Sequence, residues 1–127
     1  MKATIFRAAH YYGASTYEVE PEVFECHYAP SLKIDADLPD GELFEACLHS
    51  MAIRASSTGQ IAHHKSSMSR NGSVRRSEHG FVTVKGDGWI CQFASPEVLE
   101  LEKSFLKSGD YQKVVAIREP ISVSHFN

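Results

Sequence analysis

The chain has 127 residues, of which 43% are hydrophobic and 23% are charged, and its formal net charge is −3. This composition predicts a single globular domain, residues 1–127, and excludes an intrinsically disordered chain. No run of residues approaches the ~20 apolar residues of a membrane span. The N-terminal segment lacks the unbroken apolar core of a signal peptide, so we expect a cytoplasmic protein with no membrane partner.

Strand-forming residues dominate the first 30 positions. Residues 2–9 have a β-leaning composition. Residues 15–20 alternate apolar and polar side chains, which is the pattern of a half-buried strand. Residues 23–28 predict a further short strand, or a continuation of the previous one beyond Pro21.

A first helix is expected to begin near Pro39 or Asp40, because acidic residues in the first turn suit the positive end of the helix dipole. Apolar residues then recur at helical spacing and form one stripe for the core. The stripe consists of Leu43, Phe44, Cys47, Leu48 and Met51. Residues 56–59 provide a plausible end of this helix.

Residues 80–93 predict a β-hairpin. Its two arms, residues 81–84 and 89–93, are rich in β-branched and aromatic side chains. Between them lies the sequence Lys-Gly-Asp-Gly, in which the glycines permit a positive φ and Asp-Gly is a favoured hairpin pair. This turn explains both glycines without a phosphate-binding loop.

The last third of the chain predicts one more helix and a final strand. Ser95 suits the N-cap of a helix, and Pro96 suits its first turn. Residues 111–118 are expected to form a strand, since valine and isoleucine are frequent in them. After Pro120 the chain can continue as an edge segment of the sheet.

These elements predict an α+β fold. Hairpins outnumber the βαβ crossovers that a parallel sheet requires. We therefore expect a mostly antiparallel sheet of about five to six strands, with two helices packed on one face.

Charge is distributed unevenly along the chain. Residues 18–53 contain nine acidic residues and one lysine, a formal charge of −8, whereas residues 54–79 contain five basic residues and one acid, a formal charge of +4. This contrast could steer an anionic ligand to the basic segment. It could equally let the two segments face each other within one molecule or between subunits, and the sequence leaves both alternatives open.

The basic segment includes a serine-rich stretch, residues 62–79, for which we predict a flexible loop between helix and hairpin. Guanidinium and backbone N–H groups in such a loop can bind phosphate. The principal hypothesis is a small, non-enzymatic binding protein for an anionic ligand, either a nucleotide, another phosphorylated metabolite or a nucleic acid. The candidate ligand-binding residues are His64, Lys65, Arg70, Arg75 and Arg76.

The acidic segment supports a second hypothesis. Tyrosine is enriched at protein interfaces, and residues 17–45 combine tyrosines with acids that could dock on a basic partner. The protein would then be an interaction or inhibitor module, with a candidate surface formed by Tyr17, Glu20, Glu22 and Glu25. An exposed strand or helix face also leads us to expect a homo-oligomer.

Catalysis and metal binding have weaker support. A histidine-dependent hydrolase is a third hypothesis, because serine and histidine are frequent, although no GxSxG motif is present. The histidine spacing matches no zinc-site pattern, so we expect neither a metal nor another cofactor. The three cysteines, Cys26, Cys47 and Cys91, form no CxxC pair and are expected to be reduced thiols in the core.

Overall fold

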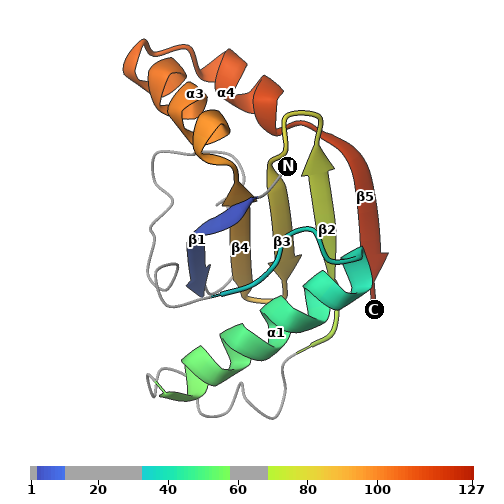
Figure 1. Ribbon diagram of the computed structural model, residues 1–127. Helices are drawn as coiled ribbons and strands as arrows, with labels where there is room; N and C mark the ends of the chain where they lie inside the picture. The colour runs from blue at the N-terminus through green and yellow to red at the C-terminus, as the bar shows by residue number, and fades with distance from the viewer. Residues whose placement is uncertain (1–2, 11–32, 58–68) are drawn as a thin grey trace.

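The computed structural model describes residues 3–10, 33–57 and 69–127, which form a five-stranded antiparallel sheet and three helices (Figure 1). The strand order is β1-β4-β3-β2-β5, so β1 and β5 are the two edges. The strands span Thr4–His10 (β1), Gly72–Ser77 (β2), Val82–Gly86 (β3), Trp89–Ala94 (β4) and Pro120–Phe126 (β5). The helices span Asp40–Ser57 (α1), Pro96–Lys107 (α3) and Tyr111–Arg118 (α4).

Helix α1 packs on one face of the sheet, against β2 and β3 (Figure 1). Its buried stripe is the one that the sequence predicts: Leu43, Phe44, Cys47, Leu48 and Met51. The strands complete this core with Val74, Val82, Val84, Trp89, Cys91 and Phe93. Because side chains alternate along a strand, the residues between these point to the opposite face.

Three aromatic rings are packed together between α1 and the sheet. Phe44 stacks on Phe126 with ring centroids 4.7 Å apart, and its centroid lies 5.7 Å from that of Trp89. Two glycines make room for these rings. A Cβ on Gly72 would lie 2.5 Å from Phe44 Cε2, and one on Gly86 would lie 2.0 Å from Trp89 Cε2. Any larger residue at either glycine would displace a buried ring.

Helices α3 and α4 pack together at one end of the sheet (Figure 1). A second apolar cluster joins them to the strands through Phe81, Ala94, Val98 and Ile117. The N-cap of α3 is Ser95, as the sequence predicts, and its hydroxyl accepts a hydrogen bond from the Val98 N–H at 3.3 Å. The cap and the apolar cluster fix the direction in which α3 leaves β4.

The predicted α+β class and the antiparallel sheet are confirmed. The first helix begins at Asp40, β3 and β4 form the expected hairpin, and β5 occupies the expected edge. The described residues contain three helices rather than two. Only α1 lies across a face of the sheet, because α3 and α4 are held at its end by their own apolar cluster.

Residues 111–118 form helix α4, so the prediction of a strand there is wrong. Gly109, with φ of 74°, follows the end of α3, and the Asp110 side chain caps α4 by accepting a backbone hydrogen bond at 3.4 Å. Val114 and Ile117 are buried three residues apart, on one face of the helix. Capping and helical burial therefore outweigh the weak strand preference of valine and isoleucine.

Residues 72–77, within the segment predicted as a flexible loop (62–79), form strand β2. The strand pairs with β3 on one side and with β5 on the other. Val74 is the only large apolar residue of β2, so the pattern of apolar side chains does not predict this strand. Backbone hydrogen bonds to two neighbours stabilise it instead. The predicted strands 15–20 and 23–28 lie outside the described residues.

Candidate functional site

Arg75 and Arg76 are adjacent in strand β2 and therefore point to opposite faces of the sheet. Arg76 lies on the face that α1 covers, where it contacts the start of that helix. Arg75 lies on the opposite face. The sequence groups these residues as one basic pair, whereas the strand gives each of them different surroundings.

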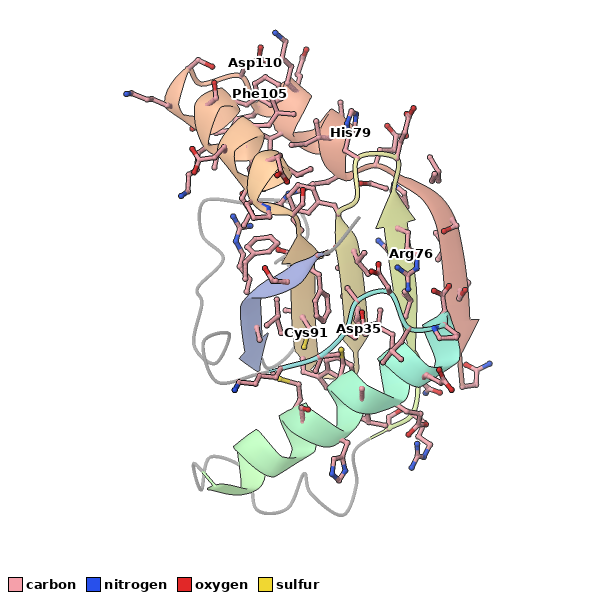
Figure 2. All side chains as sticks on the ribbon, viewed as in Figure 1. Asp35, Arg76, His79, Cys91, Phe105 and Asp110 are labelled. Carbon is pink, nitrogen blue, oxygen red and sulfur yellow. The ribbon has the colours of Figure 1, made fainter. Side chains whose placement is uncertain are left out.

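Arg76 is bound by the segment that leads into α1 (Figure 2). Its Nε donates to Asp40 Oδ1 at 2.7 Å, and its two terminal nitrogens donate to the carbonyls of Ala36 and Leu38 at 2.9 and 3.0 Å. Ser124 donates to the other Asp40 oxygen at 2.5 Å. Partial burial would raise the pKa of Asp40, but the hydrogen bonds from Ser124 and Arg76 and the Arg76 charge hold that pKa below its ordinary value. Arg76 therefore ties β2 to α1.

Arg75 belongs to a line of polar side chains across the face opposite α1. Its cross-strand partner in β3 is Thr83, and the partner of Thr83 in β4 is Gln92. Gln92 is paired in turn with Arg7 of β1. We name these four residues the polar row. Hydrogen bonds connect part of it, since Arg7 Nη1 donates to Gln92 Oε1 and Gln92 Nε2 donates to Thr83 Oγ1, both at 3.4 Å.

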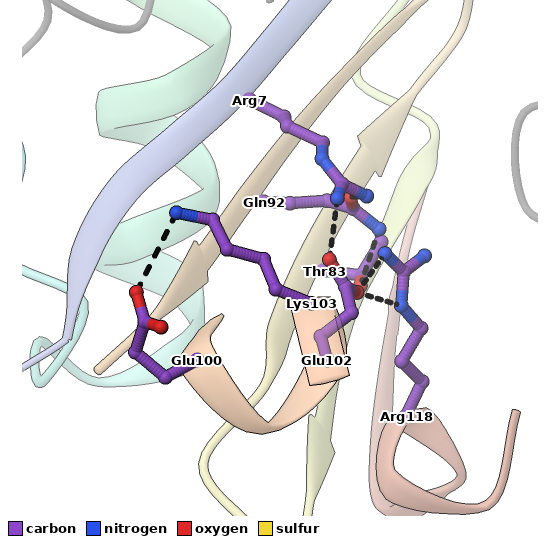
Figure 3. A network of polar contacts seen from close by, with 7 residues as sticks. All are labelled: Arg7, Thr83, Gln92, Glu100, Glu102, Lys103 and Arg118. Carbon is purple, nitrogen blue, oxygen red and sulfur yellow. Dashed lines mark hydrogen bonds and ion pairs between the residues drawn. The ribbon is translucent and has the colours of Figure 1, made fainter. Parts of the chain in front are cut away.

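Glu102 of α3 lies between two arginines at the Arg7 end of the polar row (Figure 3). Arg7 Nη2 donates to Glu102 Oε1 at 2.5 Å. Arg118 of α4 donates to Glu102 Oε2 through Nε, at 2.9 Å, and through Nη2. Glu102 is 2% exposed, and the two arginine side chains are 13% and 12% exposed. We name Arg7, Glu102 and Arg118 the charged cluster. With one carboxylate between two guanidinium groups, the charged cluster carries an excess of one positive charge.

Phenylalanine rings support both arginines of the charged cluster. Arg7 Cζ lies 4.7 Å from the ring centroid of Phe6, and Arg118 Cζ lies 5.0 Å from that of Phe81. The two rings meet edge to face with centroids 5.7 Å apart. Because the face of an aromatic ring attracts a cation, these contacts fix the guanidinium groups in position.

An open hollow of about 420 Å³ lies beside the polar row, at the ends of β2 and β3. Its lining residues are Asn71, Gly72, Ser73, Lys85, Gly86 and Asp87. Ser73 and Lys85 are cross-strand partners and lie two positions from Arg75 and Thr83, so they share the face of the polar row. The volume falls in the range of small-molecule sites, about 300–1,000 Å³. Lys85 brings a positive charge to the hollow, and Asp87 brings a negative one.

Arg70, Arg75 and Arg76, the described residues that the sequence predicts to bind a ligand, lie in three different surroundings. Arg70 pairs with Glu45 of α1, both side chains are exposed, and the hydrogen bond from Arg70 to the Glu45 carboxylate raises the pKa of Arg70. Arg75 is the one predicted residue in the polar row. The following predicted residues lie outside the described part of the chain: Tyr17, Glu20, Glu22, Glu25, His64 and Lys65.

Sequence reasoning missed the polar row and the charged cluster, because their members come from β1, β2, β3, β4, α3 and α4. No spacing along the chain relates Arg7 to Glu102, which are 95 residues apart. One signal was present in the sequence. If residues 72–77 are assigned to a strand, side-chain alternation places Arg75 and Arg76 on opposite faces of the sheet.

Three of the described histidines are exposed, and two of the described cysteines are buried. Within residues 3–10, 33–57 and 69–127, no cluster of three His, Cys, Asp or Glu side chains could hold a metal ion. His49 of α1, His79 of the turn between β2 and β3, and His125 of β5 are all exposed. Cys47 and Cys91 are buried thiols, and burial, together with the hydrogen bond between them, raises the pKa of Cys91 well above its ordinary value. The reactive thiolate of Cys91 is therefore disfavoured.

Comparisons with protein-family models, curated proteins and solved structures give no match for this chain. Among the described helices, none combines the length and the apolar character needed to cross a bilayer. A functional proposal therefore depends on the hollow, the polar row and the charged cluster.

Proposed function

We propose that this protein binds an anionic, phosphate-bearing ligand, such as a nucleotide or a nucleic acid, on the sheet face opposite α1. The binding surface consists of the hollow and the adjoining polar row, with Arg75 and Lys85 as direct contacts to phosphate. The observation that carries the proposal is that Lys85 lines a hollow of ligand size and that Arg75 stands two positions along β2 from Ser73, which also lines it. Arg7 of β1 and Arg118 of α4 lie at the other end of the polar row, in the charged cluster.

The positions of Arg75 and Lys85 suit a phosphate group. They lie on neighbouring strands, point to the same face and are diagonal neighbours in the register. Diagonal neighbours have Cα atoms about 7–8 Å apart, which two long side chains can bridge around one phosphate or diphosphate. The arginine offers a planar pair of N–H donors, and the lysine offers a compact charge.

The charged cluster supports binding through its electrostatic field. Arg7 and Arg118 are mostly buried against Glu102, so their excess positive charge acts on the surface from below rather than by contact. Charges act more strongly in such an environment than in bulk water, because the effective dielectric constant is lower. Asp87 opposes an anion in the hollow, which favours a ligand that presents hydrogen-bond donors beside its phosphate, as a nucleotide base does.

A thermal-shift panel followed by titration calorimetry tests the proposal, with pyrophosphate, ATP and a short single-stranded DNA as probes at low and moderate salt. A ligand that binds only the folded state stabilises it by about 2.7 kcal/mol at a hundredfold excess over Kd. We expect Arg75→Gln and Lys85→Gln each to weaken binding about tenfold, because a hydrogen bond to a charged group contributes about 1.5–3 kcal/mol.

The matched control is Lys103→Gln, which removes an exposed lysine of α3 that pairs with Glu100. This variant should bind the probes as the unaltered chain does. Binding of none of the probes, or equal binding by Arg75→Gln, Lys85→Gln and the control, contradicts the proposal. A salt-sensitive response to DNA would indicate a nucleic-acid ligand, and a response to ATP or pyrophosphate alone would indicate a small one.

The proposal includes a cytoplasmic location and the absence of turnover. Incubation with ATP and pyrophosphate, followed by measurement of released inorganic phosphate, tests the second point directly. Release that depends on His125, the exposed histidine of β5, would favour the hydrolase hypothesis instead.

A further inference from the structure

Strand β5 is the edge of the sheet beside β2, and no described element lies beyond it (Figure 1). An edge strand presents backbone N–H and C=O groups that a further strand can pair with. We propose that β5 pairs antiparallel with β5 of a second copy of this chain, about a twofold axis, so that one sheet continues through both copies.

β5 lacks the charged side chains that usually protect an edge strand from pairing. Its sequence, PISVSHF, contains no Lys, Arg, Asp or Glu, and its single proline stands at the first position. Its pairing with β2 is regular from Ser122 to Phe126, so the edge is not interrupted by a bulge there. The β2–β5 register shifts only before Ser122, between Arg76 and Ser77. The opposite edge strand, β1, differs in carrying the charged Arg7, and its register with β4 also shifts, between Ile5 and Arg7.

The sequence of β5 is complementary to its own antiparallel copy. Its centre reads Ser122-Val123-Ser124. A twofold axis through Val123 therefore sets valine opposite valine and each serine opposite the other serine. Valine pairs and serine pairs stabilise neighbouring strands, and no like charges meet at this centre. Closed symmetry of this kind uses the same surface on both subunits.

Exposed apolar side chains lie along this edge. Ile121 is 72% and Val123 is 42% exposed, and Val123 points to the face opposite α1, as its register partner Arg75 does. On the other face, Ser124 and Phe126 contact α1, which holds β5 in place. Pairing with a second copy removes part of the surface of Ile121 and Val123 from water, and burial of apolar surface favours association.

Sedimentation velocity of the full chain over a range of concentrations tests this proposal without any ligand, so its outcome is independent of the proposed function. We expect a shift from the 14.1 kDa of one chain to twice that mass as concentration rises. Val123→Lys and Val123→Glu should each remain monomeric where the unaltered chain is dimeric, because like charges then meet at the axis. An equimolar mixture of the two variants should restore the dimer.

Val115→Lys is the control, because it adds the same charge at an exposed valine of α4, outside β5. This variant should dimerise like the unaltered chain. Restoration in the mixture requires folded subunits, so loss of folding cannot produce the expected pattern. An unaltered chain that is monomeric at all concentrations, a dimer that survives both Val123 variants, or a mixture that stays monomeric overturns the proposal.

Discussion

The two faces of the sheet hold their side chains by different means. On the α1 face, apolar side chains and three packed rings fill the space below the helix, and one arginine, Arg76, ties a strand to the helix start. On the opposite face, hydrogen bonds link much of the polar row, and the charged cluster lies at one end of it. The first face is therefore mainly apolar, whereas hydrogen bonds and ion pairs connect polar side chains on the second.

Arg75 and Arg76 show how this difference arises. One step along a strand reverses the direction of the side chain, so two identical neighbours enter different environments. Arg76 donates to Asp40 and to two carbonyls, whereas Arg75 stands beside Thr83 in the polar row. A basic run in a sequence therefore does not define a binding site until the register of its strand is known.

Removal of the carboxylate from the charged cluster should have the largest effect on the stability of the fold. Glu102→Gln leaves Arg7 and Arg118, both mostly buried, facing each other without a counter-charge. We expect the free energy of unfolding to fall by about 3–5 kcal/mol, as when one member of a buried ion pair is removed. Urea denaturation at neutral pH measures this change.

Glu100→Gln is the matched control, since Glu100 lies on the same helix in an exposed pair with Lys103. Exposed pairs contribute about 0–1 kcal/mol, so this variant should be almost as stable as the unaltered chain. Equal losses in the two variants would mean that the charged cluster does not stabilise the face opposite α1.

Substitution of Arg75 and Arg76 one at a time tests whether the two faces of the sheet act separately. Arg76→Gln should lower the free energy of unfolding by about 2 kcal/mol, because it removes a charged hydrogen bond to partly buried Asp40. It should leave the affinity for pyrophosphate unchanged, whereas Arg75→Gln should reduce that affinity. Urea denaturation and calorimetry measure the two quantities. Loss of affinity in fully folded Arg76→Gln would show that the faces do not act separately.

The smallest expected effect concerns the pH dependence of stability, which Asp40 contributes on the α1 face. The pKa of Asp40 is lowered in the folded chain, so its carboxylate stabilises the fold fully above the ordinary value of 3.8. This contribution is lost as pH falls through the lower, folded pKa. Asp40→Asn should therefore cost about 1 kcal/mol at neutral pH and progressively less as the pH falls below 3.8. Urea midpoints of both chains at neutral and at acidic pH test this, and a difference between the chains that does not change with pH would contradict it.

The elements that could be predicted are those whose signals act over a few residues. The apolar stripe from Leu43 to Met51, the Asp-Gly turn and the Ser95 cap each specify local structure, and all three appear where expected. Helix α4 was not predicted, because the strand preference of valine and isoleucine reflects neither the Asp110 cap nor the burial of Val114 and Ile117 on one helix face. Strand β2 was missed because backbone pairing, rather than apolar side chains, stabilises it.

By itself, the sequence determined the α+β class, the start of α1, the β3–β4 hairpin and the edge position of β5. Only the tertiary structure decided that Arg75 joins Arg7, Thr83 and Gln92 on one face, while Arg76 turns to the other. The physical reason is that the hydrogen-bond register between strands sets which side chains become neighbours. Short turns set that register for the β2–β3 and β3–β4 hairpins. Spacing along the chain carries no record of it for β1 and β4, whose paired residues Arg7 and Gln92 are 85 residues apart.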